Sequence, residues 1–270
     1  MKRTVLRAVL PLISLLPLTA EVRALKPEEV GAALPLAVYQ QGLEFVFPEV
    51  IVGGEWTSTL RITNRSSAAV PATNLLFVDN SGGPMNVTFT TTAGQTITAP
   101  GAQFTLDPGA ILEATFSGGS NTQWGQAIID LCHTSPCLAD IYGEVTLRNR
   151  NPTRPDFESV FPLEVPATQQ YMLFDHRAGL ETVLYLCSAS TSPMTVALDF
   201  RDIHNQLVFS GTVNLAAAGC QILNLNVAAP PTNGIQGTLS IRGSGLVTAT
   251  ALRINPSNSF TPLRAFVPKS

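Results

Sequence analysis

Hydrophobic and polar residues alternate along short stretches over most of the chain, and this pattern predicts β-strands with one buried face. In the stretch 54–64, Leu60 and Ile62 share one face of such a strand, while Arg61 and Thr63 share the other. Similar stretches recur at intervals of roughly 8–12 residues and are separated by turns rich in Gly, Pro and Asn. No apolar pattern of helical period extends over the length that a helix needs. The chain is therefore predicted to be all-β, with antiparallel sheets in a sandwich or barrel.

A weaker copy of this strand occurs at 179–188, where Leu184 and Leu186 take the positions of Leu60 and Ile62. The strands and turns that follow also recur in the same order, in fewer residues. The sequence therefore predicts two tandem antiparallel β-sandwich domains of immunoglobulin-like type.

The predicted organisation has four segments: a signal peptide (1–24), a lead-in segment (25–42), a first β-sandwich domain (43–165) and a second β-sandwich domain (166–268). The extra residues of the first domain lie mostly between 84 and 140. Insertions usually lie in loops, and loops often carry binding sites. A separate binding surface is therefore expected first in that region.

The N-terminus has the pattern of a secretory signal peptide. The basic pair Lys2-Arg3 precedes the apolar segment 8–20, and small residues then allow cleavage after Ala20 or, preferably, after Ala24. The segment is too short and too interrupted by proline for a stable membrane span, and no later apolar run reaches that length. An uncleaved N-terminal anchor is the alternative. We expect a mature chain without a membrane span that is secreted or periplasmic.

Composition and charge narrow the range of partners. Hydrophobic residues make up 45% of the 270 residues and charged residues 13%, which is typical of a folded chain with large cores. The formal net charge is −3. It becomes −6 when the signal peptide takes away four cations and one anion. An acidic chain without a cluster of Lys and Arg argues against nucleic-acid binding and against docking to anionic membranes.

Export makes disulfides permissible, and the four cysteines fall into two pairs. Cys132 and Cys137 predict a short loop closed by its own disulfide. The alternative is a metal site formed by both thiolates with His133, although the spacing is not that of a zinc knuckle. Cys187 and Cys220 are candidates for a disulfide between strands of the second domain, or for two buried thiols.

Catalytic and cofactor motifs are weak in this sequence. There is no Gly-x-Ser-x-Gly nucleophile elbow and no phosphate-binding loop. The histidines are His133, His176 and His204, and Asp175 beside His176 leaves a hydrolase triad open, because triads assemble in space. Turn chemistry is the simpler interpretation of that Asp. We therefore predict no catalytic, cofactor-binding or metal-binding residue, and no cofactor.

The two tryptophans, Trp56 and Trp124, are candidates for stacking on sugar rings. Exposed aromatic side chains on a β-sandwich can bind carbohydrate in this way. Packing into the core or over its edge is the more frequent role of a tryptophan in such strands.

The run Gly53-Gly-Glu-Trp-Thr-Ser-Thr-Leu60, the later Asn64, the strand end at Asp79 and the turn Pro108-Gly109 resemble exported tandem β-sandwich proteins of environmental bacteria, whose function is uncharacterised. The resemblance extends over about residues 45–267. Its motifs mark strand starts and turns, so it implies a fold and not an activity.

Taken together, these patterns favour an exported, non-catalytic binding or scaffolding protein of the cell envelope or extracellular space. Its partner would be an unknown protein or glycan outside the cytoplasm. The alternative is a secreted hydrolase or a carbohydrate-binding module acting on polysaccharide, so the question of an enzyme stays open with the balance against it.

Overall fold

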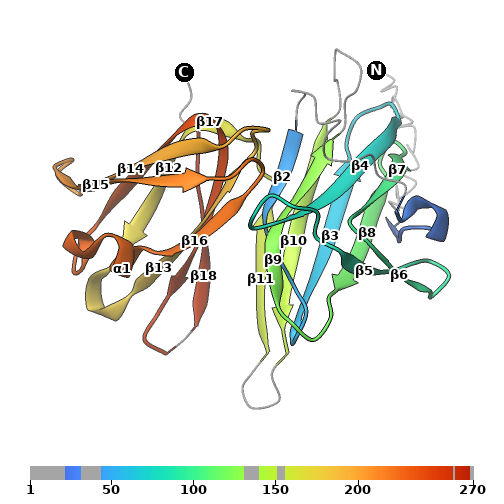
Figure 1. Cartoon of the computed structure of the whole chain (residues 1–270), viewed down its shortest axis with the longest axis horizontal. Helices are drawn as coiled ribbons and strands as arrows, with labels where there is room; N and C mark the ends of the chain where they lie inside the picture. The colour runs from blue at the N-terminus through green and yellow to red at the C-terminus, as the bar shows by residue number, and fades with distance from the viewer. Residues whose placement is uncertain (1–21, 32–43, 131–139, 151–155, 258, 268–270) are drawn as a thin grey trace, which may run out of the picture.

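The structure, a computed structural model, describes residues 22–31, 44–130, 140–150, 156–257 and 259–267. Antiparallel β-sheet dominates these residues, which confirms the all-β fold class. Figure 1 shows the strands gathered into two lobes that lie side by side. We call β1 to β11 the N-terminal lobe and β12 to β18 the C-terminal lobe.

The N-terminal lobe is built from two sheets. The first has the order β11–β10–β3–β8–β5–β6, with β1 pairing in parallel with β8. Its strands are β1 (Val22–Arg23), β3 (Trp56–Asn64), β5 (Val87–Thr90), β6 (Thr96–Ala99), β8 (Ile111–Ser117), β10 (Ile141–Asn149) and β11 (Phe157–Pro162). The second has the order β2–β9–β4–β7, with strands β2 (Glu44–Val52), β4 (Val70–Asp79), β7 (Gly101–Leu106) and β9 (Gln123–Asp130).

The C-terminal lobe is one continuous sheet with the order β15–β14–β17–β13–β16, in which β12 and β18 also pair with β17. Its strands are β12 (Ala167–Asp175), β13 (Glu181–Ser188), β14 (Met194–Asp202), β15 (Leu207–Leu215), β16 (Cys220–Asn224), β17 (Gln236–Ile254) and β18 (Phe260–Arg264). The short helices of the described chain are η1 (Pro27–Glu29), η3 (Arg177–Gly179), α1 (Leu225–Ala228) and η4 (Pro230–Thr232).

The long strand β17 connects the two halves of the C-terminal lobe. Its first half pairs with β12 and β14, and its second half pairs with β13 and β18. The sequence pattern predicts two separate strands here, at 234–241 and 248–254, with Gly243 and Gly245 between them. The strand instead continues through these glycines, where a Cβ on Gly243 would lie 2.5 Å from the Gly245 oxygen. Small residues thus allow one strand to serve both halves.

Each lobe has its own hydrophobic core, produced by the predicted alternation. In β3, Leu60 and Ile62 are fully buried between the two sheets while Arg61 is exposed. In the C-terminal lobe, Leu184 and Leu186 of β13 are buried in a second cluster with residues of β12, β14 and β17. The predicted domain boundary at residues 165 and 166 lies close to the place where pairing passes from the first two sheets to the third, and it stays a prediction.

The lobes contact each other through buried residues. Val46, Val78 and Ile128 of the N-terminal lobe form a small apolar cluster with Ala189 and Ala218 of the C-terminal lobe. We call the contacting surfaces of the two lobes the lobe interface. The segment after β11 is part of the lobe interface, because Leu163 and Glu164 are buried.

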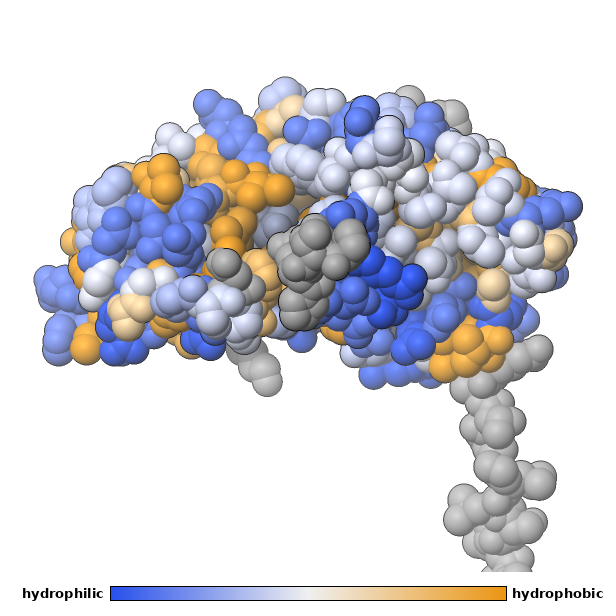
Figure 2. All heavy atoms as spheres, turned by 90° about the horizontal axis from the view of Figure 1, so that it is seen from below, coloured by the Kyte–Doolittle hydropathy of each residue, from blue (hydrophilic) through white to orange (hydrophobic). Residues whose placement is uncertain are grey.

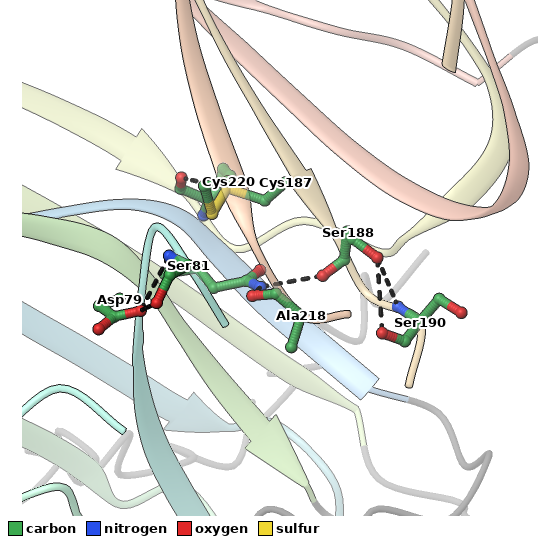
Figure 3. The surroundings of a disulfide bond; sticks show 9 residues. Asp79, Ser81, Cys187, Ser188, Ser190, Ala218 and Cys220 are labelled. Atoms are coloured by element: carbon green, nitrogen blue, oxygen red, sulfur yellow. Dashed lines mark hydrogen bonds between the residues drawn. A yellow bond between two sulfur atoms is a disulfide. The ribbon is translucent and has the colours of Figure 1, made fainter. Parts of the chain in front are cut away.

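Hydrogen bonds at the lobe interface join β9 and the β4–β5 turn to the C-terminal lobe. The Gln126 side-chain amide donates to the carbonyl oxygens of Ser188 (2.9 Å) and Ala218 (2.7 Å). The Cys220 backbone N–H donates to the Asn80 carbonyl at 3.0 Å. Figure 3 shows Ser188 and Ala218 of this contact close to the Cys187–Cys220 disulfide. The approach is close, since a Cβ on Gly82 would lie 2.0 Å from the Ala217 oxygen.

Candidate functional site

Two adjoining hollows open on the outer face of the C-terminal lobe. The larger has a volume of about 550 Å³ and the smaller about 370 Å³. Asn205 and Thr238 line both hollows, so together they form one groove. We call this the β12–β17–β14 groove, after the strands that supply most of its lining.

Strand alternation explains which side chains reach the groove. Thr238 of β17 lies opposite Leu173 of β12 on one side and Arg201 of β14 on the other. All three line the groove, while their neighbours Leu239 and Phe200 are buried in the core. The same period of two that builds the core therefore directs a row of polar and apolar side chains outward.

The β14–β15 turn closes one end of the groove. The Asp202 carboxylate accepts hydrogen bonds from the backbone N–H groups of His204 (2.9 Å) and Gln206 (2.8 Å). Asn205 takes a positive φ of 62°, which Asn tolerates better than most residues. This turn places Ile203 at the rim of the groove with 64% of its surface exposed.

The equivalent turn of the N-terminal lobe has the same chemistry. The Asp79 carboxylate accepts from the backbone N–H groups of Ser81 and Gly83, both at 2.9 Å. Turn chemistry therefore accounts for the Asp79-Asn-Ser-Gly-Gly run. This turn contacts the C-terminal lobe instead of opening on a hollow.

The acidic side chains of the groove already have partners. Asp175 pairs with Arg177 through two hydrogen bonds of 2.9 Å, and this contact lowers the pKa of Asp175. Asp199 pairs with Arg242 and accepts from the Ser210 hydroxyl at 2.6 Å. With the turn-forming Asp202, every carboxylate of the groove accepts hydrogen bonds from the protein itself.

Two arginines of the groove lack an acidic partner. Arg201 donates to the Asn205 carbonyl at 2.9 Å and forms no ion pair with any described residue. The Arg253 side chain has no hydrogen bond or ion pair among the residues that the structure describes, although its charge helps to lower the pKa of Asp175. Their guanidinium groups keep N–H donors available to a ligand.

His176 is a buried structural residue beside this groove. The Thr232 hydroxyl donates to the Ala229 carbonyl at 2.7 Å, so it accepts a hydrogen bond from His176 Nδ1 at 2.8 Å. His176 Nε2 is buried with no partner among the described residues, and burial lowers the pKa of the ring. A hydroxyl that donates elsewhere is not activated by this imidazole. His204 lies on the exposed β14–β15 turn, and His133 is outside the described residues.

A buried carboxyl lies at the lobe interface, and sequence reasoning missed it. Glu49, at a β-bulge in β2, is 1% exposed. Neither of its carboxyl oxygens has a well-formed hydrogen bond, although the nearby Tyr185 hydroxyl partly offsets the effect of burial. Burial raises the pKa of Glu49 to about 8. A lone acidic residue in the otherwise apolar run 45–52 is the sequence signal that could have indicated it.

Threonine hydroxyls lie on the neighbouring face of the C-terminal lobe. Thr250 of β17 is directly opposite Tyr185, and Thr248 is directly opposite Cys187. Both hydroxyls are buried and have no hydrogen-bond partner among the described residues. Together with Glu49, they give this part of the lobe interface buried polar groups without hydrogen-bond partners. Such groups lower the stability of the folded state.

A second buried carboxyl, Glu164, pairs across the lobe interface with Arg264 of β18 at 3.1 Å. Burial raises the pKa of Glu164 to about 7, and the arginine opposes this shift. The rings of Phe157 and Phe260, the first residues of β11 and β18, also meet edge to face, with centroids 4.5 Å apart. Charged and aromatic contacts thus extend the lobe interface toward β18.

The disulfide candidates have different outcomes. Cys187 and Cys220 form a disulfide between the paired strands β13 and β16, which confirms the first alternative for this pair. Cys187 Sγ also lies 3.2 Å from the Pro48 oxygen of the N-terminal lobe. Cys132 and Cys137 lie outside the described residues, as does the metal alternative with His133. Within the described part of the chain, no group of three His, Cys, Asp or Glu side chains could hold a metal ion.

The tryptophans pack against the N-terminal core. Trp56 is partly buried, and its ring meets Phe157 edge to face with centroids 5.7 Å apart. Trp124 is also partly buried and packs against the same core. Neither residue lines the β12–β17–β14 groove, so ligand stacking by these rings stays a prediction.

Hydrophilic and hydrophobic residues both reach the face of the molecule that Figure 2 shows. Seen from below, hydrophobic residues gather in a band on the C-terminal lobe (Figure 2). None of the helices among the described residues has the length and apolar character needed to cross a membrane.

Comparisons with known proteins do not assign the chain to a family. No family model matches it, and neither a curated protein nor a solved structure matches it significantly. The chain's own residues are therefore the guide to its function.

Proposed function

We propose that this chain is an exported, non-catalytic binding protein and that the β12–β17–β14 groove receives its ligand. The observation that carries this proposal is which charged side chains of the groove have partners within the protein. Its three aspartates accept hydrogen bonds from protein groups, while Arg201 and Arg253 keep free donors. Such a lining favours binding, because catalysis by carboxylates requires them to be free to exchange protons.

The ligand should be rich in oxygen acceptors. Guanidinium groups bind carboxylate and hydroxyl oxygens well, and they bind carboxylates with two parallel hydrogen bonds. Leu173 and Ile203, each 64% exposed, offer an apolar contact next to Arg253. A polysaccharide or an extended peptide segment has both kinds of group.

The groove suits a chain-like ligand because its two adjoining hollows are open to solvent. Two hollows that share Asn205 and Thr238 give room for consecutive units of a polymer. The outer edge of β12 is blocked near Tyr171, where Tyr171 and Phe266 exchange backbone hydrogen bonds of 2.9 and 2.8 Å. A ligand is therefore expected to bind through side chains of the groove and not as an added strand at the edge of β12.

Export, tandem duplication and a location outside the cytoplasm belong to the same proposal. The disulfide between Cys187 and Cys220 supports export and a location outside the cytoplasm, since disulfides persist in oxidising compartments. The matching Asp79 and Asp202 turns support a duplicated module. The buried lobe interface supports a scaffolding role, because it holds the two lobes in one arrangement.

The hydrolase alternative has less support. The carboxylates of the groove have partners, and His176 is hydrogen-bonded to a hydroxyl that donates elsewhere. A carbohydrate-binding module remains within the proposal, with the groove in place of the tryptophans as the expected contact.

A direct test is to screen the purified exported protein on arrays of glycans and of peptides, alongside a Thr238→Trp variant. Thr238 lines both hollows, so an indole at this position should fill the groove and abolish the binding. An exposed residue of the N-terminal lobe, changed in Thr115→Trp, is the control and should leave binding unchanged. Equal binding by the wild type and Thr238→Trp would refute the groove, and release of product from a bound polymer would refute the non-catalytic part.

A further inference from the structure

Arg201 and Arg253 differ from the other arginines that the structure describes. Each of those others lies within ion-pair distance of an Asp or Glu carboxylate. Arg201 and Arg253 have no such partner among the described residues, and both line the β12–β17–β14 groove. The two guanidinium groups without a neutralising carboxylate thus lie at one place on the molecule, where an anion from outside can bind them.

The groove has a positive formal charge on a chain that is negative overall. It holds four arginines and three aspartates when Arg177, the partner of Asp175, is included. The formal net charge of these side chains is therefore +1, while that of the whole chain is −3. Asp202, the aspartate of this set without an arginine partner, accepts hydrogen bonds from two backbone N–H groups. This local excess of positive charge favours an anionic ligand.

Each of the two hollows contains one of these arginines. Arg253 lines the larger hollow and Arg201 lines the smaller one, while Asn205 and Thr238 line both. One ligand can therefore lie across the shared residues and reach both guanidinium groups. A ligand that uses both has at least two anionic groups, carried on separate units of one chain.

Neutral polar side chains complete the lining. Asn205, Gln236 and Thr238 line the larger hollow, and their side chains form no hydrogen bond with a described residue. Amides and hydroxyls both donate and accept, so they match the hydroxyl groups of sugars. Extended peptides often bind as an added strand, and the backbone bonds between Tyr171 and Phe266 block that mode at the edge of β12. These features favour a polysaccharide over a peptide.

We infer that the ligand of the groove is an acidic polysaccharide whose sugar units carry carboxylates, that is, a polyuronate. One carboxylate binds Arg253 and a second binds Arg201, while sugar hydroxyls contact Asn205, Gln236 and Thr238. The inference rests on the proposed binding function of the groove and narrows its ligand to one chemical class.

The test compares one polymer in two charge states. The dissociation constant of the purified exported protein is measured for polygalacturonate and for its fully methyl-esterified form, which has the same sugar rings without free carboxylates. The acid form should bind at least about tenfold more tightly, because charge-assisted hydrogen bonds are the stronger ones. This preference should decrease as the NaCl concentration rises from about 0.05 M to about 0.5 M, since salt screens exposed charges.

A matched pair of variants locates the preference in the groove. Arg201→Gln/Arg253→Gln should bind the acid and ester forms equally. Arg61→Gln, which removes an exposed arginine of the N-terminal lobe, should keep the preference of the wild type. A loss of preference in the Arg61 variant alone would overturn the inference.

A length series and an acidic peptide give further readouts on the wild-type protein. Trigalacturonate should bind at least about tenfold more tightly than galacturonate, because the second carboxylate binds in an intramolecular step. Equal affinity for the acid and ester forms, or tighter binding of polyglutamate, overturns the inference and leaves the proposed binding function intact. Unchanged binding of polygalacturonate by Thr238→Trp overturns both, because it places the site outside the groove.

Discussion

The Glu49 carboxyl of β2 and the Tyr185 hydroxyl of β13 face each other across the buried lobe interface. Burial raises the pKa of both groups, and the Glu49 charge raises that of Tyr185 further. The titratable or charged groups on nearby interface elements are Glu164 and its partner Arg264. Ionised Glu49 would therefore be an unneutralised charge in the interface.

The first prediction is that the protein loses stability as pH rises. The Glu49 pKa is about 8 in the folded chain and near the ordinary glutamate value of 4.5 when the chain is unfolded. The folded state therefore binds the proton more tightly than the unfolded state does. The contribution of protonated Glu49 to the free energy of unfolding is complete below pH 4.5. It decreases as pH rises to about 8 and is absent above that pH. The loss is about 5 kcal/mol at most, at about 1.4 kcal/mol for each pH unit.

Glu49→Gln removes this titration while keeping the shape of the side chain. Urea unfolding at pH 5, 7 and 9 should show the variant gaining stability relative to wild type as pH rises. The exposed Glu158→Gln is the control and should follow the wild type. Parallel pH profiles for wild type and Glu49→Gln would show that Glu49 does not titrate as the structure indicates.

The second prediction concerns Gln126, which joins the lobes through two hydrogen bonds. Gln126→Leu should lower the free energy of unfolding by about 2–4 kcal/mol, because two buried carbonyl oxygens lose their donor. Gln221→Leu removes one exposed amide–carbonyl bond of 3.0 Å and should cost far less. Equal losses in the two variants, measured by urea unfolding, would argue against a structural role for this contact.

The third prediction concerns the Cys187–Cys220 disulfide, whose cysteines are 33 residues apart in sequence. Replacing both residues by Ala should cost about 4 kcal/mol, mainly through greater freedom of the unfolded chain. Replacing Cys132 and Cys137, predicted to close a much shorter loop, should cost about 2 kcal/mol. Thermal and urea unfolding of both double variants measure this. A larger loss from the Cys132 and Cys137 pair would contradict the ranking.

The fourth prediction concerns Arg23. Arg23→Ala should cost about 1–3 kcal/mol, because Glu29 and the Thr105 carbonyl lose charge-assisted hydrogen bonds. Arg65→Ala breaks an ion pair with Asp140 in which both side chains are 57% exposed, and it should cost less than about 1 kcal/mol. Urea unfolding compares them. An Arg23 variant as stable as the Arg65 variant would indicate that β1 contributes little to the fold.

Local patterns predict much of this fold. The alternation at Leu60 and Ile62 shows which face is buried, and the turn residues at Asp79 and Asp202 show where strands end. These features depend on neighbours in sequence, so one sequence contains them. The sequence also allows a Cys187–Cys220 disulfide as one of two alternatives. The register of β13 and β16, which places Cys187 opposite Cys220, decides between them.

The functional surfaces were harder to predict because they depend on residues far apart in sequence. The groove brings Leu173, Arg201 and Thr238 together from three strands, and the lobe interface brings Glu49 to Tyr185. No local pattern indicates that Arg253 lacks an acidic partner or that β17 continues through Gly243. The inserted region between 84 and 140 contributes the β5–β6 hairpin to the first sheet, and the binding surface expected there stays a prediction.

The central claim is that the free guanidinium groups of the β12–β17–β14 groove hold the ligand. The most direct measurement is the dissociation constant of the array-selected ligand for wild type, Arg201→Ala/Arg253→Ala and the control Arg61→Ala, whose side chain lies on the N-terminal lobe. The account predicts that affinity falls at least about tenfold in the double variant, since each bond from a charged donor contributes about 1.5–3 kcal/mol, and stays unchanged in the control. Equal affinity in all three proteins would contradict it.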